Sequence, residues 1–334
     1  MNLVIFGSEF YSLYFSWLLS TNNKLIILNK SNFNGLFVNE NYGGIFIHKN
    51  EKIIKMLNDL GVDYKFRQLI EVGFFNSEIV KLHTIQELKK DDYLKKIMNC
   101  DIKNIKIDTT SFFNDIKEII IFDKYEFIGK LICFLLKNNV IFDNSESFCI
   151  EDGIIKAESG NEYKYDKLLF TSSLIDYNQL KNNYLDDYIV KIGDNIYAQN
   201  IIFFNDMKEI TWDVCYFYDK FCPNISNIKR IVKKNQKIFT VEYFKYFENN
   251  SNSLHYLINC VNKIFNNDSY YIDLPFQLPG SISVNDFYEI MIPEIDDDNI
   301  YLFGRYCTLR TREYIGDTIE DFHSRFLKRM DNEY

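Results

Sequence analysis

The chain has 334 residues, of which 47% are hydrophobic and 25% charged, and its net charge is −9. This composition excludes a disordered chain and suits two interleaved domains with packed cores. The negative charge argues against nucleic acid and anionic membranes as partners.

The cysteine pattern and the apolar content of the sequence indicate the compartment in which we expect the protein. Seven cysteines, an odd number, form no Cys-x-x-Cys pair and no cluster with the four histidines. We therefore expect free thiols in a reducing compartment and no metal site, with zinc or a disulfide framework as the lesser alternative. No secretory leader is apparent, and no stretch reaches the roughly 18 apolar residues of a membrane helix. The sequence therefore predicts a cytoplasmic protein without a membrane partner; a homo-oligomer stays open.

The first 30 residues follow the pattern of a βαβ unit. Apolar runs at 3–6 and 24–28 flank residues 10–19, whose large apolar side chains recur at helical spacing. Strand, tight turn, helix and strand within so short a stretch indicate two neighbouring parallel strands.

The turn after the first strand reads Gly7-Ser8-Glu9-Phe10-Tyr11-Ser12. A dinucleotide fold needs glycine at three places here, for the turn, for the approach of the pyrophosphate and for helix packing. Gly7 fits the first place and Ser12 is small enough for the third, but Glu9 crowds and repels phosphates at the second. Taken alone, the motif also fits a βαβ unit that binds no nucleotide.

The end of the second predicted strand is the usual place for an acid that binds ribose hydroxyls. Asn29 stands there, 22 positions after Gly7, and Lys30 follows it. An asparagine accepts a hydrogen bond from a ribose hydroxyl more weakly than a carboxylate does. The position therefore fits a dinucleotide site while the residue weakens it.

The middle of the chain adds helices and a small meander. Spacing of apolar residues predicts helices over 51–60, which stops at Gly61, and over 125–137, followed by a strand at 140–142. Good hairpin turns separate three short predicted strands, at 147–150, 154–158 and 163–165. An apolar strand follows them at 167–170.

The remaining stretches are less regular. Residues 66–124 show no clear repeat, and residues 176–290 are typical of a separate α+β region rich in tyrosine and phenylalanine. Near the end, 299–303 is a buried-type strand that stops at Gly304, and 317–330 has helical spacing.

Four segments, in order, resemble the UDP-galactopyranose mutase branch of FAD proteins, which shares its flavin domain with amine oxidases. The first is the βαβ unit, and the second is Tyr42 to Asn50, which is similar to a family segment beside the flavin. The third is Ile228 to Val232, which follows the aromatic-acid run Tyr216 to Asp219 and is similar to a family strand whose arginine reaches the active site. The fourth is Asn299 to Tyr306, which continues through Ile319. The meander that returns to Thr171 also matches the family's layout.

The resemblance implies an α/β fold: a Rossmann-like FAD-binding domain with a parallel sheet and a β-meander, plus an inserted mixed α+β substrate domain. We expect the FAD-binding domain at 1–65, 125–175 and 291–334, and the substrate domain at 66–124 and 176–290.

The resemblance also implies a set of site residues. Predicted contacts to FAD are Gly7, Ser8, Glu9, Phe10, Asn29, Lys30, Gly43, Gly44, Phe148, Thr171, Gly304, Arg305, Ile315, Gly316, Asp317 and Thr318. A helix that begins near Gly316 presents N–H groups and a positive dipole end to the flavin or its phosphates. Arg230 and Arg305 are the expected clamp on a diphosphate substrate, with His48 and Tyr218 also at the reacting centre. The competing interpretations are a solvated charge for Arg230, a structural ion pair for Arg305 and a packed or surface histidine for His48.

Three functions follow from these residues. The leading one is an FAD-dependent enzyme that resembles UDP-galactopyranose mutase and acts on a nucleotide sugar or a related anionic small molecule, with reduced flavin attacking the anomeric carbon. The second is a flavin oxidoreductase of the amine-oxidase type, which needs no diphosphate clamp. The third is a non-catalytic descendant of the fold, motivated by Glu9, by Asn29 and by Ile45, where the family has a histidine.

Overall fold

The computed structural model describes residues 1–7, 9–30, 46–75, 78–81, 118–151, 153–181, 195–204, 210–217, 225–230, 238–243, 251–266, 269–273, 276–282, 299–304 and 315–333. At its centre lies a five-stranded sheet with the order β19-β12-β1-β2-β8, in which every neighbouring pair is parallel. Its strands are β1 (Asn2–Phe6), β2 (Lys24–Leu28), β8 (Ile141–Asp143), β12 (Lys167–Phe170) and β19 (Ile300–Leu302). The predicted fold class, an α/β protein with a parallel sheet and a meander, is confirmed.

Apolar runs form these strands because both faces of the sheet are covered. Alternate residues enter two separate cores: Leu3 and Ile5 belong to one, and Val4 and Phe6 to the other. The first core includes α1 (Phe10–Leu19), α3 (Glu51–Asp59) and α6 (Lys124–Lys137), and the second includes α7 (Leu174–Leu180). Full burial of one such side chain contributes about 1.5–3 kcal/mol.

Two small antiparallel sheets flank the parallel one. The meander is β9 (Phe148–Glu151), β10 (Ile154–Ala157) and β11 (Glu162–Lys164), in the order β11-β10-β9. The other has the order β3-β7-β4, from β3 (Ile47–His48), β7 (Glu118–Phe122) and β4 (Tyr64–Gln68).

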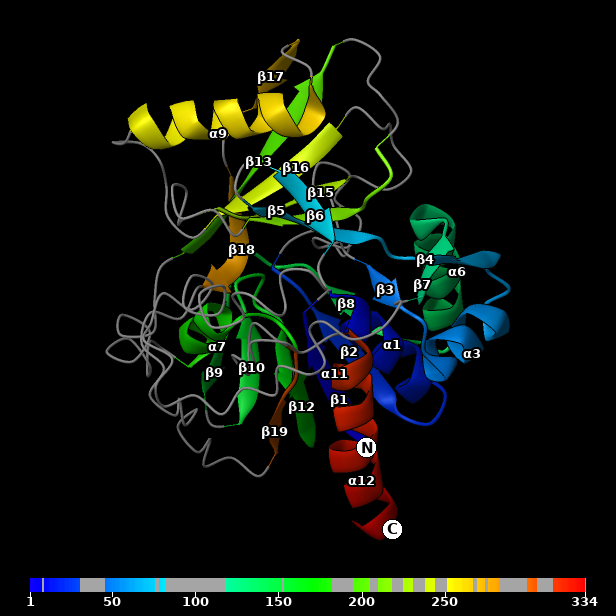
Figure 1. The fold of residues 1–334 in the computed structure, drawn as a ribbon. Coiled ribbons are helices and arrows are strands. Elements are labelled where there is room, and N and C mark those ends of the chain that lie inside the picture. Colours follow the sequence, from blue (N-terminus) through cyan, green and yellow to red (C-terminus); the bar gives the residue numbers. More distant parts are fainter. Residues whose placement is uncertain are drawn as a thin grey trace, which may run out of the picture.

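An eight-stranded sheet forms the other half of the molecule, with the order β17-β13-β16-β15-β14-β5-β6 and β18 also paired with β13. Its strands are β5 (Glu71–Phe75), β6 (Glu78–Lys81), β13 (Asn195–Phe203), β14 (Val214–Phe217), β15 (Ile225–Arg230), β16 (Ile238–Tyr243), β17 (Tyr270–Ile272) and β18 (Phe276–Ile282). Helix α9 (Ser251–Phe265) lies on one side of this sheet and the parallel sheet on the other (Figure 1).

The sequence prediction missed two features. Helix α7 begins with a capping box, in which Ser173 and Asp176 exchange hydrogen bonds. The predicted C-terminal helix consists of α11 (Ile315–Asp321), a π-helical segment η2 (Phe322–Leu327) and α12 (Lys328–Glu333). Among the residues that the structure describes, no helix is long and apolar enough to cross a membrane.

Candidate functional site

The carboxyl ends of β1 and β12 lie side by side at the centre of the parallel sheet. The chain leaves β1 through α1 and returns on one side as β2, whereas β12 pairs with β1 on the other side. Such a reversal of strand order opens a crevice outside the carboxyl ends, where α/β proteins bind dinucleotides. The sheet therefore offers its ligand site at Gly7 and Thr171.

Gly7 has a geometry that other residues cannot adopt without strain. Its φ is +130°, and a Cβ atom there would lie 2.3 Å from Thr171 Oγ1. Its N–H donates to the Leu28 carbonyl over 2.9 Å. The absence of a side chain thus lets the turn close against the end of β12.

A second glycine joins the same junction from β19. Gly304 has a φ of +93°, and a Cβ atom there would lie 2.2 Å from the Tyr11 hydroxyl oxygen. That hydroxyl donates to the Thr171 carbonyl over 3.0 Å. The Ser12 hydroxyl oxygen lies 2.7 Å from Thr171 Oγ1. The junction therefore brings Gly7, Thr171 and Gly304, all predicted cofactor residues, to one place around α1.

Glu9 stands at the start of α1, where its side chain makes no capping hydrogen bond to the helix. Burial raises the pKa of its carboxyl to about 7, although the residue as a whole is partly exposed. Near neutral pH a large share of the molecules therefore carries a neutral carboxyl, which donates a hydrogen bond.

These observations decide how the β1–α1 turn suits a pyrophosphate. Gly7 makes the tight turn, and α1 starts directly behind it with its positive dipole end, which favours an anion. An ionised Glu9 opposes phosphates, but the neutral form removes the repulsion. The turn fits a pyrophosphate when Glu9 is protonated.

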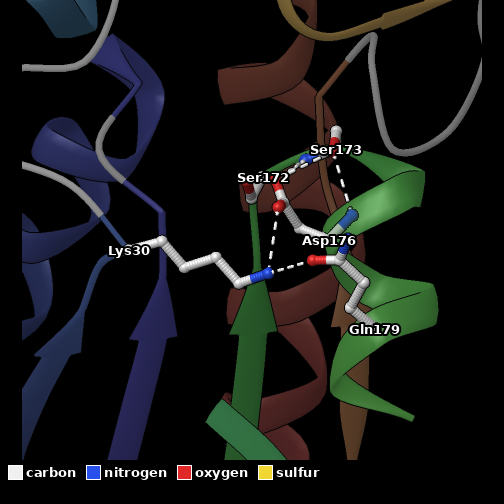
Figure 2. A network of polar contacts seen from close by, with 5 residues as sticks. All are labelled: Lys30, Ser172, Ser173, Asp176 and Gln179. Carbon is white, nitrogen blue, oxygen red and sulfur yellow. Dashed lines mark hydrogen bonds and ion pairs between the residues drawn. The ribbon is translucent and has the colours of Figure 1, made fainter. Parts of the chain in front are cut away.

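Lys30 leaves the end of β2 and reaches α7 beyond the end of β12 (Figure 2). Its ammonium group donates to Gln179 Oε1 and lies 3.3 Å from Asp176 Oδ1. The other oxygen of Asp176 accepts from Ser172 Oγ at 2.5 Å and Ser173 Oγ at 2.8 Å. The network spans the middle strand β1, at the edge where the ligand site lies.

Sequence reasoning missed Asp143, which fastens the meander to the sheet. Asn29, buried at 6% exposure, donates its N–H to the Asp143 carbonyl over 3.0 Å. The Asp143 carboxylate accepts from Ser145 Oγ at 2.6 Å, Asn161 Nδ2 at 3.1 Å and Tyr163 OH at 2.5 Å. Burial opposes ionisation, but these hydrogen bonds outweigh it and hold the pKa of Asp143 below its usual range.

Two predicted cofactor residues have side chains in the core. Phe10 is 1% exposed and packs against Phe122 and Phe127. Phe148 makes an edge contact with Phe6, their ring centroids 5.4 Å apart. Only the backbone at residue 10, the first of α1, lies at the candidate pyrophosphate turn.

His48 and the first turn of α11, which begins with Ile315, Gly316, Asp317 and Thr318, form a second group. His48 pairs with Ile119 between β3 and β7, and α11 packs against β3. A Cβ atom at Gly316 would lie 3.4 Å from Asn50 Nδ2, and Lys52 forms an ion pair with Glu320. The structure thus brings His48 near the helix start that the sequence predicted, and their role stays a prediction.

Five predicted site residues lie outside the described residues: Ser8, Gly43, Gly44, Tyr218 and Arg305. Of Arg230 the structure describes the backbone, at the end of β15 opposite Phe239. Among the described residues there is no cluster of histidine, cysteine or acidic side chains that suits a metal ion.

Solved structures of several enzymes superpose on this chain at low sequence identity. Reduced UDP-galactopyranose mutase superposes with a TM-score of 0.67 at 11% identity, over 98% of this chain and 96% of the mutase. An oxidoreductase from Methanosarcina mazei gives 0.59 at 11% identity (92% and 95% covered), and L-proline dehydrogenase from P. horikoshii gives 0.54 at 10% (98% and 93%). No protein-family model and no curated protein matches the chain. The comparisons show that this chain shares its fold, over nearly its whole length, with these three enzymes.

Proposed function

We propose that this chain is an FAD-dependent enzyme that resembles UDP-galactopyranose mutase and acts on a nucleotide sugar or a related anionic substrate. The observation that carries the proposal is the junction of β1, α1 and β12, where Gly7 closes on Thr171 beside the start of α1. The match to reduced UDP-galactopyranose mutase over almost all of both chains supports the choice of activity.

The described residues that would hold FAD divide by its parts. The backbone of Gly7, Glu9 and Phe10 would hold the pyrophosphate, and Asn29 and Lys30 would hold the adenosine end. When bound, the flavin supplies the reacting ring, whereas the protein orients the substrate and excludes water. Glu9 in its neutral form would offer a hydrogen-bond donor to that pyrophosphate. We also propose that the chain divides into an FAD-binding domain and a substrate domain. Arg305 and Tyr218 are the proposed contacts to the substrate.

Two alternatives keep specific support. An amine-oxidase-type oxidoreductase is supported by the fold it shares with L-proline dehydrogenase, and a non-catalytic descendant by Glu9, whose carboxyl stands at the phosphate turn.

The test is a visible spectrum of the purified protein, followed by incubation of the dithionite-reduced sample with UDP-galactopyranose. Visible flavin absorption bands that bleach on reduction, and formation of the ring-contracted isomer, are the expected results. Flavin bands with amine oxidation and no isomer would favour the oxidoreductase. A protein that stays colourless after incubation with FAD would contradict both enzyme functions.

A further inference from the structure

One face of the eight-stranded sheet carries a row of paired polar side chains. The strand registers place Glu71 opposite Val214, Val214 opposite Lys229, Lys229 opposite Thr240 and Thr240 opposite Asn200. Because opposite residues in a sheet share a face, these positions from five strands share one face. We call it the polar face; Tyr216 and Glu242, two residues along their strands from Val214 and Thr240, also belong to it.

The opposite face is apolar and covered. Cys215, Ile228 and Val241 alternate with the polar positions, and they form a core with Val261 and Phe265 of α9. The polar face is therefore turned away from α9, toward the side on which Figure 1 shows the parallel sheet. Ligand sites of two-part proteins lie preferentially between the parts.

Three hydrogen-bonded pairs make up the row. The Tyr216 hydroxyl donates to Glu71 Oε1 over 2.8 Å, and Thr240 Oγ1 donates to Asn200 Oδ1 over 2.9 Å. Between them Lys229 Nζ lies 2.6 Å from Glu242 Oε1, with side-chain exposures of 18% and 11%.

Such pairs do not serve folding well. Withdrawing a lysine and a glutamate from water costs several kcal/mol per ion, and well-packed apolar side chains would often replace them without loss. A charged pair among buried polar groups, on the face that looks toward the other half of the molecule, is therefore a candidate for ligand binding.

The strand register also separates Lys229 from its neighbour. Position 230 lies opposite Phe239, on the face of Ile228, whereas position 229 lies opposite Thr240 on the polar face. By register, Lys229 is therefore the position of β15 that brings a cation to the polar face, and Arg230 stays a predicted diphosphate contact.

The charges of the row indicate the kind of ligand. Its described members carry two carboxylates and one ammonium group, and the ammonium is neutralised by Glu242. This balance disfavours a diphosphate. Paired donors and acceptors without excess positive charge suit a neutral ligand rich in hydroxyl groups, since each hydroxyl both donates and accepts.

We propose that the polar face binds the sugar part of the substrate, with Lys229 donating to and Glu242 accepting from its hydroxyl groups. This inference rests on the proposed function, because that function supplies the nucleotide to which the sugar is attached. It makes Lys229 and Glu242 specificity-determining residues. It also assigns the sugar and the diphosphate to different residues.

The experiment measures, by calorimetry, the binding of UDP and of UDP-galactose to the purified full chain and to variants. Lys229→Met/Glu242→Met removes the pair without leaving a buried charge, and Glu242→Gln keeps its shape. The matched control is Lys156→Met/Glu151→Met, an exposed lysine–glutamate pair on the meander with the same 2.6 Å separation. Thermal unfolding checks that each variant folds.

We expect UDP-galactose to bind the wild type at least about tenfold more tightly than UDP. The double variant at 229 and 242 should lose this advantage and keep its affinity for UDP, E242Q should lose part of it, and the control should keep all of it. An equal loss for both ligands, a retained advantage, a loss confined to Arg230→Met, or no advantage in the wild type would overturn the inference. The flavin bands of the same samples test the proposed function separately. A colourless protein that still prefers UDP-galactose would contradict the flavin-dependent function and leave the sugar-binding inference in place.

Discussion

The two large sheets of this molecule bury their strands in different ways. The parallel sheet is apolar on both faces, since Leu3 and Val4 enter different cores. The eight-stranded sheet is apolar only beneath α9 and carries Lys229 and Glu242 on its other face. The parallel sheet is therefore a platform whose chemistry is confined to its carboxyl edge, whereas the second sheet carries paired, largely buried polar side chains along one face.

The strongest way to break the parallel platform is to add a side chain at its edge. Gly7→Ala places a methyl group against Thr171 Oγ1 in a strained backbone conformation, so we expect a loss of about 4 kcal/mol in unfolding free energy and no bound flavin. Urea unfolding measures the first effect. Gly61→Ala is the matched control, because φ is +66° and no atom lies within 4 Å of its Cβ position; it should cost about 1 kcal/mol. Equal losses would show that the contact with Thr171 is unimportant.

A second test breaks an ion pair between β4 and the residue that precedes β14. Arg67 of β4 holds Asp213, which is 0% exposed and precedes β14, through two hydrogen bonds of 2.5 and 2.8 Å. Arg67→Met leaves a buried carboxylate without this partner and should cost about 3 kcal/mol in urea unfolding. Lys49→Met, which breaks an exposed pair with Glu118, should cost about 0.5 kcal/mol. A small loss for Arg67→Met would mean that the ion pair contributes little to stability.

The third test uses the titration of Glu9 at the platform's edge. Its pKa rises from 4.5 unfolded to about 7 folded, so the folded state binds the proton more tightly and stability falls as pH rises through this window. Glu9→Gln removes the loss, and we expect it to be about 2 kcal/mol more stable than the wild type at about pH 8 and equal to it at about pH 4. Its affinity for FAD should exceed the wild type's at about pH 8. Parallel pH profiles of the two proteins would contradict the assignment.

The smallest effect concerns the network in Figure 2. Lys30→Met breaks a partly exposed contact to Asp176 and Gln179, so it should change the unfolding free energy by less than about 1 kcal/mol. Asp176→Ala also removes the capping box of α7 and should cost about 1 kcal/mol more. Thermal unfolding of both variants measures these effects. A greater loss of stability for Lys30→Met than for Asp176→Ala would show that the network across β1 supports the fold.

Much of the parallel region could be predicted from sequence. The bounds of α1, β2 and β12 are those that apolar periodicity indicated, because strands buried on both faces are continuous apolar runs. Asp143 and Asp176 could not be found, since their partners lie in strands or turns distant in sequence. The prediction of Arg230 came from a short motif, whereas only the pairing of β15 with β16 shows that positions 229 and 230 lie on different faces of the sheet.

The most direct test of the central claim, that a dinucleotide lies across the carboxyl edge of the parallel sheet, is a calorimetric titration of the apoprotein with FAD and with FMN at about pH 6. FMN lacks the adenosine half that Asn29 and Lys30 would hold and one of the two phosphates. We predict that FAD binds at least about a hundredfold more tightly than FMN. Equal affinity for the two flavins, or no heat from FAD, would contradict the account.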